Sequence, residues 1–194
     1  MIPDSNPHHL VLGELKDFLT GLNITDTHDE RYRQKIAKLL VLEKAFDKAD
    51  IEAGKGIEIS AGGKKAGIKI DYLVGHQGKI VMLIKYAPGS LVTRRLSTLA
   101  LSRIVRPYQI LVVVIANGED AEVMEGDSGR VTATGLDNIP DKDAIMKNYD
   151  SFSFKPIKTR VFDQASKIVF ACGVDGACPC DSDICLLDEK DVSR

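Results

Sequence analysis

The amino-acid sequence predicts an α/β fold: a mixed β-sheet flanked by helices, with a helical, cysteine-rich extension at the C-terminus. Apolar residues recur at three- and four-residue steps in residues 27–49, 91–105 and 159–171, which is typical of amphipathic helices. They alternate or run together in residues 57–59, 68–72, 79–86 and 109–116, which is typical of strands. All 4 cysteines fall within residues 172–185.

The composition is that of one ordinary globular domain with a small appendage. The chain has 194 residues, 44% hydrophobic and 28% charged, and is long enough to bury a full core. Its longest apolar run, residues 110–116, is far below the roughly 20 residues that cross a bilayer, and residues 1–10 lack the features of a signal peptide. We therefore expect a cytoplasmic protein with no membrane partner. The net charge of -2 indicates that any DNA contact is local.

Two helices are predicted before the sheet. The apolar spacing in residues 8–22 predicts a short packing helix. Thr27 and Glu30 then have the spacing of a capping box, in which each side chain satisfies a free backbone N–H at a helix start. This second helix is expected to run to about residue 49.

A three-stranded meander follows. Residues 57–59 and 68–72 alternate on either side of a turn at 61–65, and a second turn at 75–78 leads to a mostly apolar, central strand at 79–86. A helix over 91–105 crosses one face of the sheet. The strand at 109–116 should run parallel to 79–86, because a helix connects the two.

The remaining elements are smaller. Residues 121–124 and 130–134 predict a hairpin at an edge of the sheet. A short helix is expected at 141–149 and a last helix at 159–171, which leads into the cysteine segment.

Charged side chains are expected to gather on one face of the meander. A turn centred near residues 76 and 77 places Asp71 opposite Met82 or Leu83. In the Leu83 register one face holds Lys69, Asp71, Leu83 and Lys85, with Glu58 beside Lys69. Two acids on such a face can hold Mg²⁺, which activates water against a phosphodiester while a lysine stabilises the developing charge. Here Leu83 stands two residues before Lys85, so the second acid is absent.

The sequence around these residues resembles a known family. The second helix, Asp71, the string Leu83-Ile84-Lys85-Tyr86-Ala87-Pro88-Gly89-Ser90-Leu91 and the string Ala116-Asn117-Gly118-Glu119-Asp120-Ala121 look like the N-terminal nuclease-like domain of type I restriction enzyme R subunits. The stand-alone bacterial proteins with that domain are more similar still. The resemblance implies a restriction-endonuclease-like fold of the PD-(D/E)xK class. The resemblance covers the nuclease-like domain (27–140). The sequence pattern predicts an N-terminal helix before it (1–26) and a helical extension with the four-cysteine segment after it (141–194).

The family's pattern is a glutamate on the first helix, an aspartate at a strand end and Glu-x-Lys on the next strand. By resemblance it maps to Glu30, Asp71, Leu83 and Lys85, so three positions match and Leu83 departs. The candidate catalytic residues are Asp71, Lys85, Glu30 and Glu58, with Asp71 as a Mg²⁺ ligand if the domain is active. The candidate nucleic-acid contacts are Lys69, Lys85, Arg94 and Arg95.

Three classes of function remain open, in this order. The first is a degenerate module that binds nucleic acid or assists a restriction system; the second is an active Mg²⁺-dependent endonuclease; the third is an interaction scaffold that kept the fold without the chemistry. DNA, a restriction-system protein or a second copy are the expected partners. Simpler accounts exist: the cap explains Glu30, and Asp71 with Lys85 fits a surface ion pair worth ~1 kcal/mol or less.

The cysteine segment is a separate chemical signal. Four thiols lie within fourteen residues, at Cys172, Cys178, Cys180 and Cys185. Four thiolates can hold Zn²⁺ or an iron–sulfur cluster, although the spacing is neither that of a zinc ribbon nor that of a ferredoxin. The alternatives are a redox-sensitive disulfide, an unliganded tail, or a Cys172 that is buried as a small hydrophobe.

Overall fold

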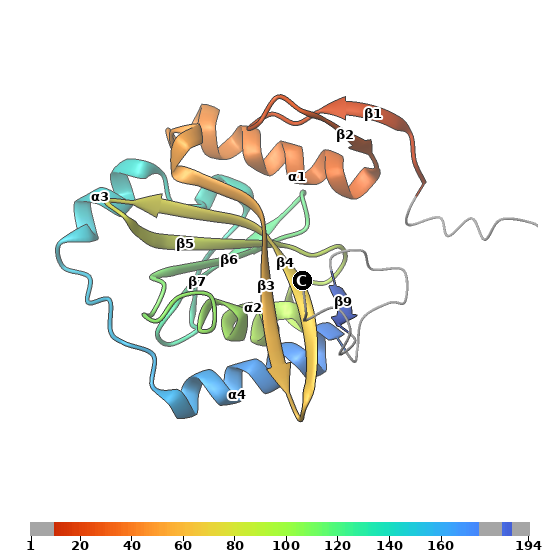
Figure 1. Ribbon diagram of the computed structural model, residues 1–194. Coiled ribbons are helices and arrows are strands. Elements are labelled where there is room, and N and C mark those ends of the chain that lie inside the picture. Colours follow the sequence, from red (N-terminus) through yellow and green to blue (C-terminus); the bar gives the residue numbers. More distant parts are fainter. Residues whose placement is uncertain (1–9, 175–183, 188–194) are drawn as a thin grey trace, which may run out of the picture.

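The computed structural model describes residues 10–174 and 184–187, and it shows a mixed sheet with helices on both faces (Figure 1). The strand order is β3-β4-β5-β6-β7-β8, and β9 pairs with β4 as a seventh strand. β5 and β6 are parallel and every other neighbouring pair is antiparallel. The predicted mixed α/β sheet and its parallel pair are therefore confirmed. The strands are β3 (Ile51–Ala61), β4 (Lys64–His76), β5 (Lys79–Tyr86), β6 (Val112–Ala116), β7 (Ala121–Glu125), β8 (Val131–Thr134) and β9 (Ile184–Leu187).

The hairpin of β3 and β4 is longer than the sequence suggested. Its turn consists of Gly62 and Gly63 alone, with φ angles of 59° and 78°. Positive φ at both central residues is what a tight two-residue hairpin needs, and glycine adopts it without strain. The tight turn fixes the register, with Ala61 opposite Lys64 and Glu58 opposite Gly67.

The helix predicted at residues 8–22 is wrong. This segment forms a two-stranded hairpin of β1 (Gly13–Lys16) and β2 (Asn23–Asp26). Asp17 begins its turn, because its carboxylate accepts 2.7 Å hydrogen bonds from both the backbone N and the hydroxyl of Thr20. Gly21 closes the turn at a φ of 74°. Such local bonds compete with a helix, and most of the apolar side chains that suggested one are exposed.

Helix α1 (His28–Lys38) begins as predicted and ends earlier. The Thr27 hydroxyl accepts a 3.1 Å hydrogen bond from the backbone N of Glu30. After α1 the chain makes one π-helical turn at Leu39–Glu43, and Ala45 has a φ of 59°, which ends the helix well before residue 49. In Figure 1, α1 lies across one face of the sheet.

A close contact fixes the position of α1. Gly118, in the loop between β6 and β7, lies against the ring of Tyr32, and a Cβ at this glycine would lie 2.1 Å from that ring. The Nζ of Lys35 donates a 2.8 Å hydrogen bond to the Gly118 carbonyl. Only glycine allows so close an approach, which holds the first turns of α1 at one end of the sheet.

The other helices confirm the prediction with shorter limits. They are α2 (Arg95–Ser102), preceded by a 3₁₀ turn at Val92–Arg94, α3 (Lys142–Tyr149) and α4 (Thr159–Val169). α2 and α4 lie on the face of the sheet opposite α1 (Figure 1). Among the described residues, no helix has the length and apolar character needed to cross a bilayer.

The core has two parts, one on each face of the sheet. Ile36 of α1 and Leu40 of the following π-helical turn pack against Tyr72, Ile84 and Val114 on one face. On the other face, side chains of α2 and α4 pack against alternate residues of the same strands; this part includes Leu73, Leu83, Ala100, Leu101, Val113, Ile115, Ala165 and Val169. The two faces therefore offer separate surfaces for function.

Candidate functional site

Asp71 and Lys85 meet where β4 and β5 lie side by side. Tyr72 pairs with Ile84, so Asp71 faces Lys85 and not Leu83 as predicted. The register that put Asp71 opposite Leu83 is off by two residues: His76 pairs with Lys79, one residue further along than in that register, and a bulge between Val74 and Gly75 adds another residue. An even shift leaves side chains on the same face, so Asp71 and Lys85 still come together.

The Asp71 carboxylate is buried and fully engaged. Its side chain is 1% exposed, and its Oδ1 accepts a 2.7 Å hydrogen bond from Arg33 Nε. Its Oδ2 lies 2.9 Å from Lys85 Nζ and accepts a 2.9 Å bond from the backbone N of Tyr86. Burial alone would raise the pKa of Asp71, but the charges of Lys85 and Arg33 outweigh it and hold this pKa below its ordinary value. Asp71 is therefore ionised at neutral pH.

Arg33 is the site residue that sequence reasoning missed. Besides binding Asp71, its guanidinium lies 3.8 Å from Glu30 and stacks over the Tyr86 ring at 5.1 Å from the centroid. We call Lys85, Asp71, Arg33 and Glu30 the charge network. A signal for Arg33 was present, because it follows Glu30 by three residues and so lies on the same side of the helix.

Glu30 belongs to this network as predicted, but it does not meet Asp71 directly. Its carboxylate accepts a 2.8 Å hydrogen bond from Gln34 Nε2, and its side chain is 17% exposed. The Arg33 guanidinium stands between the two acids, bonded to Asp71 and close to Glu30. With two acids and two bases, the formal charge of the network is zero.

Two tyrosines attach the network to its surroundings. The hydroxyl of Tyr86 donates a 2.9 Å bond to Asp29, and that of Tyr72 donates a 2.7 Å bond to the Arg33 carbonyl. Burial raises the pKa of both tyrosines well above the ordinary value. Both hydroxyls are therefore protonated donors at neutral pH, and they hold α1 against the strands that carry Asp71.

The N-terminal hairpin is attached to the same helix. Gln34 Nε2 donates a 2.6 Å bond to Asp17, and Gln34 Oε1 accepts a 2.7 Å bond from the backbone N of Phe18. The amide of Gln34 thus links the hairpin turn to Glu30 of the charge network.

Leu83 is buried in the hydrophobic core and is not exposed to solvent beside the charge network. Its side chain is 0% exposed, lies opposite Leu73 and belongs to the core on the α2 and α4 face. The position at which the family pattern has its second acid is therefore part of the hydrophobic core.

The remaining predicted site residues lie elsewhere. The expected contact of Glu58 with Lys69 is wrong, because Lys69 pairs with Gly56 and Glu58 forms a 3.0 Å ion pair with Lys65. Lys69 does lie next to the network, since its carbonyl accepts a 3.2 Å bond from Lys85 Nζ.

The two candidate arginines lie at the start of α2, the helix that packs on the other face of the sheet. Arg95 forms a two-pronged ion pair with Glu122 of β7. Arg94 is exposed at the preceding position. Only Arg94 of this pair therefore offers a solvent-facing charge to a nucleic acid.

The described residues contain no group of three or more histidine, cysteine or acidic residues that could hold a metal ion. Cys172 is exposed in the π-helical turn Phe170–Val174 that follows α4, so the alternative of a buried Cys172 is wrong. Cys185 lies on β9, whereas Cys178 and Cys180 lie outside the described residues. The metal site predicted for the cysteine segment therefore stays a prediction.

The fold and the site define an α/β domain in which an aspartate and a lysine meet across neighbouring strands next to a helix that carries a glutamate. Residues 28–140 match the family described as type I restriction enzyme R protein N terminus. The chain belongs to this family, which confirms the resemblance seen in the sequence. Neither the curated proteins nor the solved structures contain a match.

Proposed function

We propose that this chain is a nuclease-like module that no longer cleaves DNA and that contacts nucleic acid, in the cytoplasm, as an accessory part of a restriction or DNA-processing system. Family membership supports the restriction-related role. The state of Asp71 supports the loss of cleavage: its two carboxylate oxygens already accept from Arg33, Lys85 and the Tyr86 backbone.

A divalent cation would have to displace these donors. Mg²⁺ gives up its water reluctantly and needs several oxygen ligands with compensating negative charge. At Asp71 it would stand beside two positive side chains, which oppose it. Leu83 provides no ligand, and Glu30 is engaged by Gln34 and Arg33. The guanidinium thus supplies the positive charge between the two acids that a metal ion would otherwise supply.

The distribution of charge supports a nucleic-acid contact. Residues 72–118 contain no acidic residue, although the whole chain has a net charge of -2. The same stretch carries Lys79, Lys85, Arg94, Arg95, Arg103 and Arg106. Lys85 and Arg95 are engaged with carboxylates, so the contact rests on fewer charges and should be weak and strongly dependent on salt.

Two measurements test the proposal. Plasmid DNA incubated with the protein and Mg²⁺ or Mn²⁺ should stay intact. A labelled DNA duplex should be shifted, with an affinity that falls steeply with salt and falls further in Arg94→Glu. The matched control is Lys38→Glu, which makes the same charge change at an exposed position of α1 and should weaken DNA binding less.

Two outcomes contradict the proposal. Metal-dependent cleavage by the wild type that disappears in Asp71→Asn would establish the active endonuclease instead. A protein that neither cuts nor shifts DNA at low salt would leave the scaffold as the remaining class of function.

A further inference from the structure

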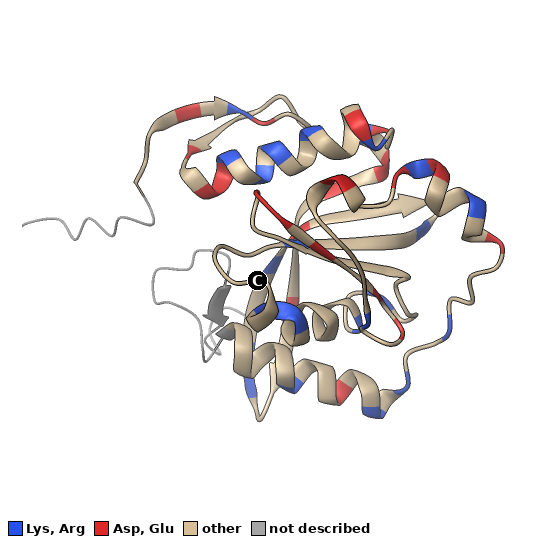
Figure 2. Cartoon of the chain, turned by 180° about the vertical axis from the view of Figure 1, so that it is seen from behind, with Lys and Arg blue, Asp and Glu red and all other residues tan. Residues whose placement is uncertain are grey.

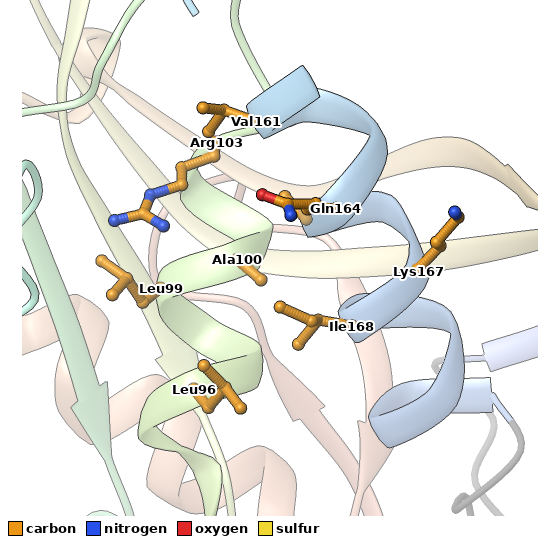
Figure 3. Close-up of a pocket in the computed structure, with 9 residues that line it drawn as sticks. Leu96, Leu99, Ala100, Arg103, Val161, Gln164, Lys167 and Ile168 are labelled. Atoms are coloured by element: carbon orange, nitrogen blue, oxygen red, sulfur yellow. The ribbon is translucent and has the colours of Figure 1, made fainter. Parts of the chain in front are cut away.

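A groove runs between α2 and α4, on the face of the sheet opposite α1 (Figure 3). Its volume is about 400 Å³. Its walls are mainly apolar and consist of Leu96, Leu99, Ala100, Val161, Ala165 and Ile168. None of the residues that line the groove belongs to the charge network.

Large apolar side chains of α2, of the turn before it and of α4 are open to water. Leu96 is 59% exposed, Val92 one turn earlier is also 59% exposed, and Phe162 of α4 is 44% exposed. Single exposed apolar residues are ordinary, but a contiguous group along a groove marks an interaction surface. Leu96 and Leu99 lie on one side of α2 and Val92 lies in the 3₁₀ turn before it, a spacing of apolar side chains that can accept an amphipathic helix.

The charge of the groove is of one sign. Arg103 and Lys167 line it together with the neutral Gln164, and among its described lining residues none is acidic. Figure 3 shows Arg103 reaching out from α2 near Val161 and Lys167 extending from α4 on the side away from α2. The Arg103 guanidinium donates a 3.1 Å hydrogen bond to the backbone carbonyl of Asp127. This carbonyl is neutral, so the bond does not cancel the positive charge of Arg103.

The wider surroundings continue this pattern. Blue residues mark the segments that contain α2 and α4 in the view from behind (Figure 2). Asp163 is the one acidic residue of α4, against Arg160 and Lys167, and α2 has none. An acidic ligand would therefore be attracted to both walls of the groove.

We propose that this groove binds a short amphipathic helix of a partner protein, with large apolar side chains along one side and carboxylates placed to meet Arg103 and Lys167. The apolar walls favour a protein segment over nucleic acid. Phosphates and base edges would lose water there without gaining hydrogen-bond partners, whereas leucine-like side chains would fill the groove. The groove shares Arg103 with the stretch proposed to contact DNA, so the test below also measures the DNA shift.

The test uses three fluorescein-labelled helical peptides of equal length and fluorescence anisotropy. The first carries leucines along one side and glutamates elsewhere, the second has lysines in place of the glutamates, and the third has alanines in place of the leucines. The full chain should bind the first peptide at least about tenfold more tightly than either of the others, because both burial and charge contribute.

Variants of the chain locate the binding. Leu96→Gln should weaken binding of the first peptide about tenfold without changing charge, because it removes a central apolar contact. Leu42→Gln is the matched control, since Leu42 is 69% exposed on the other side of the sheet and should have no effect. Arg103→Gln should reduce the salt dependence of binding. Because Leu96 is mostly exposed, unchanged thermal melting is expected and confirms that the variant folds.

Five results would overturn the proposal. Equal affinity for the glutamate and lysine peptides, or no detectable binding, removes the acidic helix as the ligand. Unchanged affinity in Leu96→Gln places the peptide elsewhere. A dimer in sedimentation that Leu96→Gln disrupts assigns the groove to a second copy. Loss of the DNA shift in Leu96→Gln, a change that keeps the charge, assigns it to nucleic acid and is distinguishable from the effect of Arg94→Glu.

Discussion

Asp71→Asn is the most informative single change, because it removes the negative charge of the network and keeps the size of the side chain. Arg33 and Lys85, whose side chains are 17% and 20% exposed, would lose the carboxylate that neutralises them. Removing one partner of a buried ion pair costs about 3–5 kcal/mol. Both cations keep some access to water, and the amide oxygen still accepts one bond, so we expect a loss of about 2–4 kcal/mol in the free energy of unfolding.

Urea unfolding followed by circular dichroism measures this loss. The matched control is Asp26→Asn, which makes the same chemical change at a bidentate pair with Arg31. Arg31 is 56% exposed, so this control should cost less stability than Asp71→Asn. An Asp71→Asn protein as stable as the wild type, or more stable, would refute the reasoning. It would show that Asp71 is kept at a cost to stability, as the ligand of an active metal site would be.

Three further predictions follow from the same geometry. The pKa of Asp71 in the folded protein lies below its ordinary value of 3.8. Ionised Asp71 therefore contributes its full stabilisation above pH 3.8, and this contribution is lost as the pH falls through the lowered pKa. The free energy of unfolding should fall less steeply with acid in Asp71→Asn than in the wild type. A cation that bound the folded state would raise the melting temperature. We expect no Mg²⁺ binding at Asp71, so millimolar Mg²⁺ should leave the melting temperature of the wild type unchanged. A rise that disappears in Asp71→Asn would show that Mg²⁺ binds at the charge network. Leu83→Glu, which restores the family's acid, should lower the free energy of unfolding by several kcal/mol and restore no cleavage, since the position is 0% exposed; cleaved plasmid would contradict this.

The central part of the fold could be predicted because its patterns are unambiguous. The strand at 79–86 and the Val/Ile-rich strand after the crossover helix are buried on both faces, and the helix between them allows only a parallel pair. The N-terminal hairpin could not be predicted from apolar spacing. Leu10, Val11 and Leu22 suggested the buried side of a helix, but all three are exposed, and burial depends on the rest of the fold. The local turn chemistry of Asp17 was the better signal.

The site was predicted in part for a geometric reason. Pairing in a sheet has a period of two, so an error of two residues in register kept Asp71 and Lys85 on one face. For Glu58 the expected position depended on a five-residue turn, and the two-glycine turn moved its contacts along the strand. Arg33 was missed because its partner Asp71 lies 38 residues away in the sequence, a contact that only the docking of α1 on the sheet creates.

The same docking explains how the charge of Asp71 is balanced. An aspartate at a buried strand position requires a cation nearby, because burial alone would favour its neutral form. Lys85 is opposite it on the next strand, but one lysine leaves Oδ1 without a charged partner, and Arg33 of α1 supplies the second. The tyrosine hydroxyl bond to the Arg33 carbonyl and the close contact at Gly118 keep α1 at this distance. Asp71 therefore joins α1 to the sheet, which gives the residue a structural role that does not depend on catalysis.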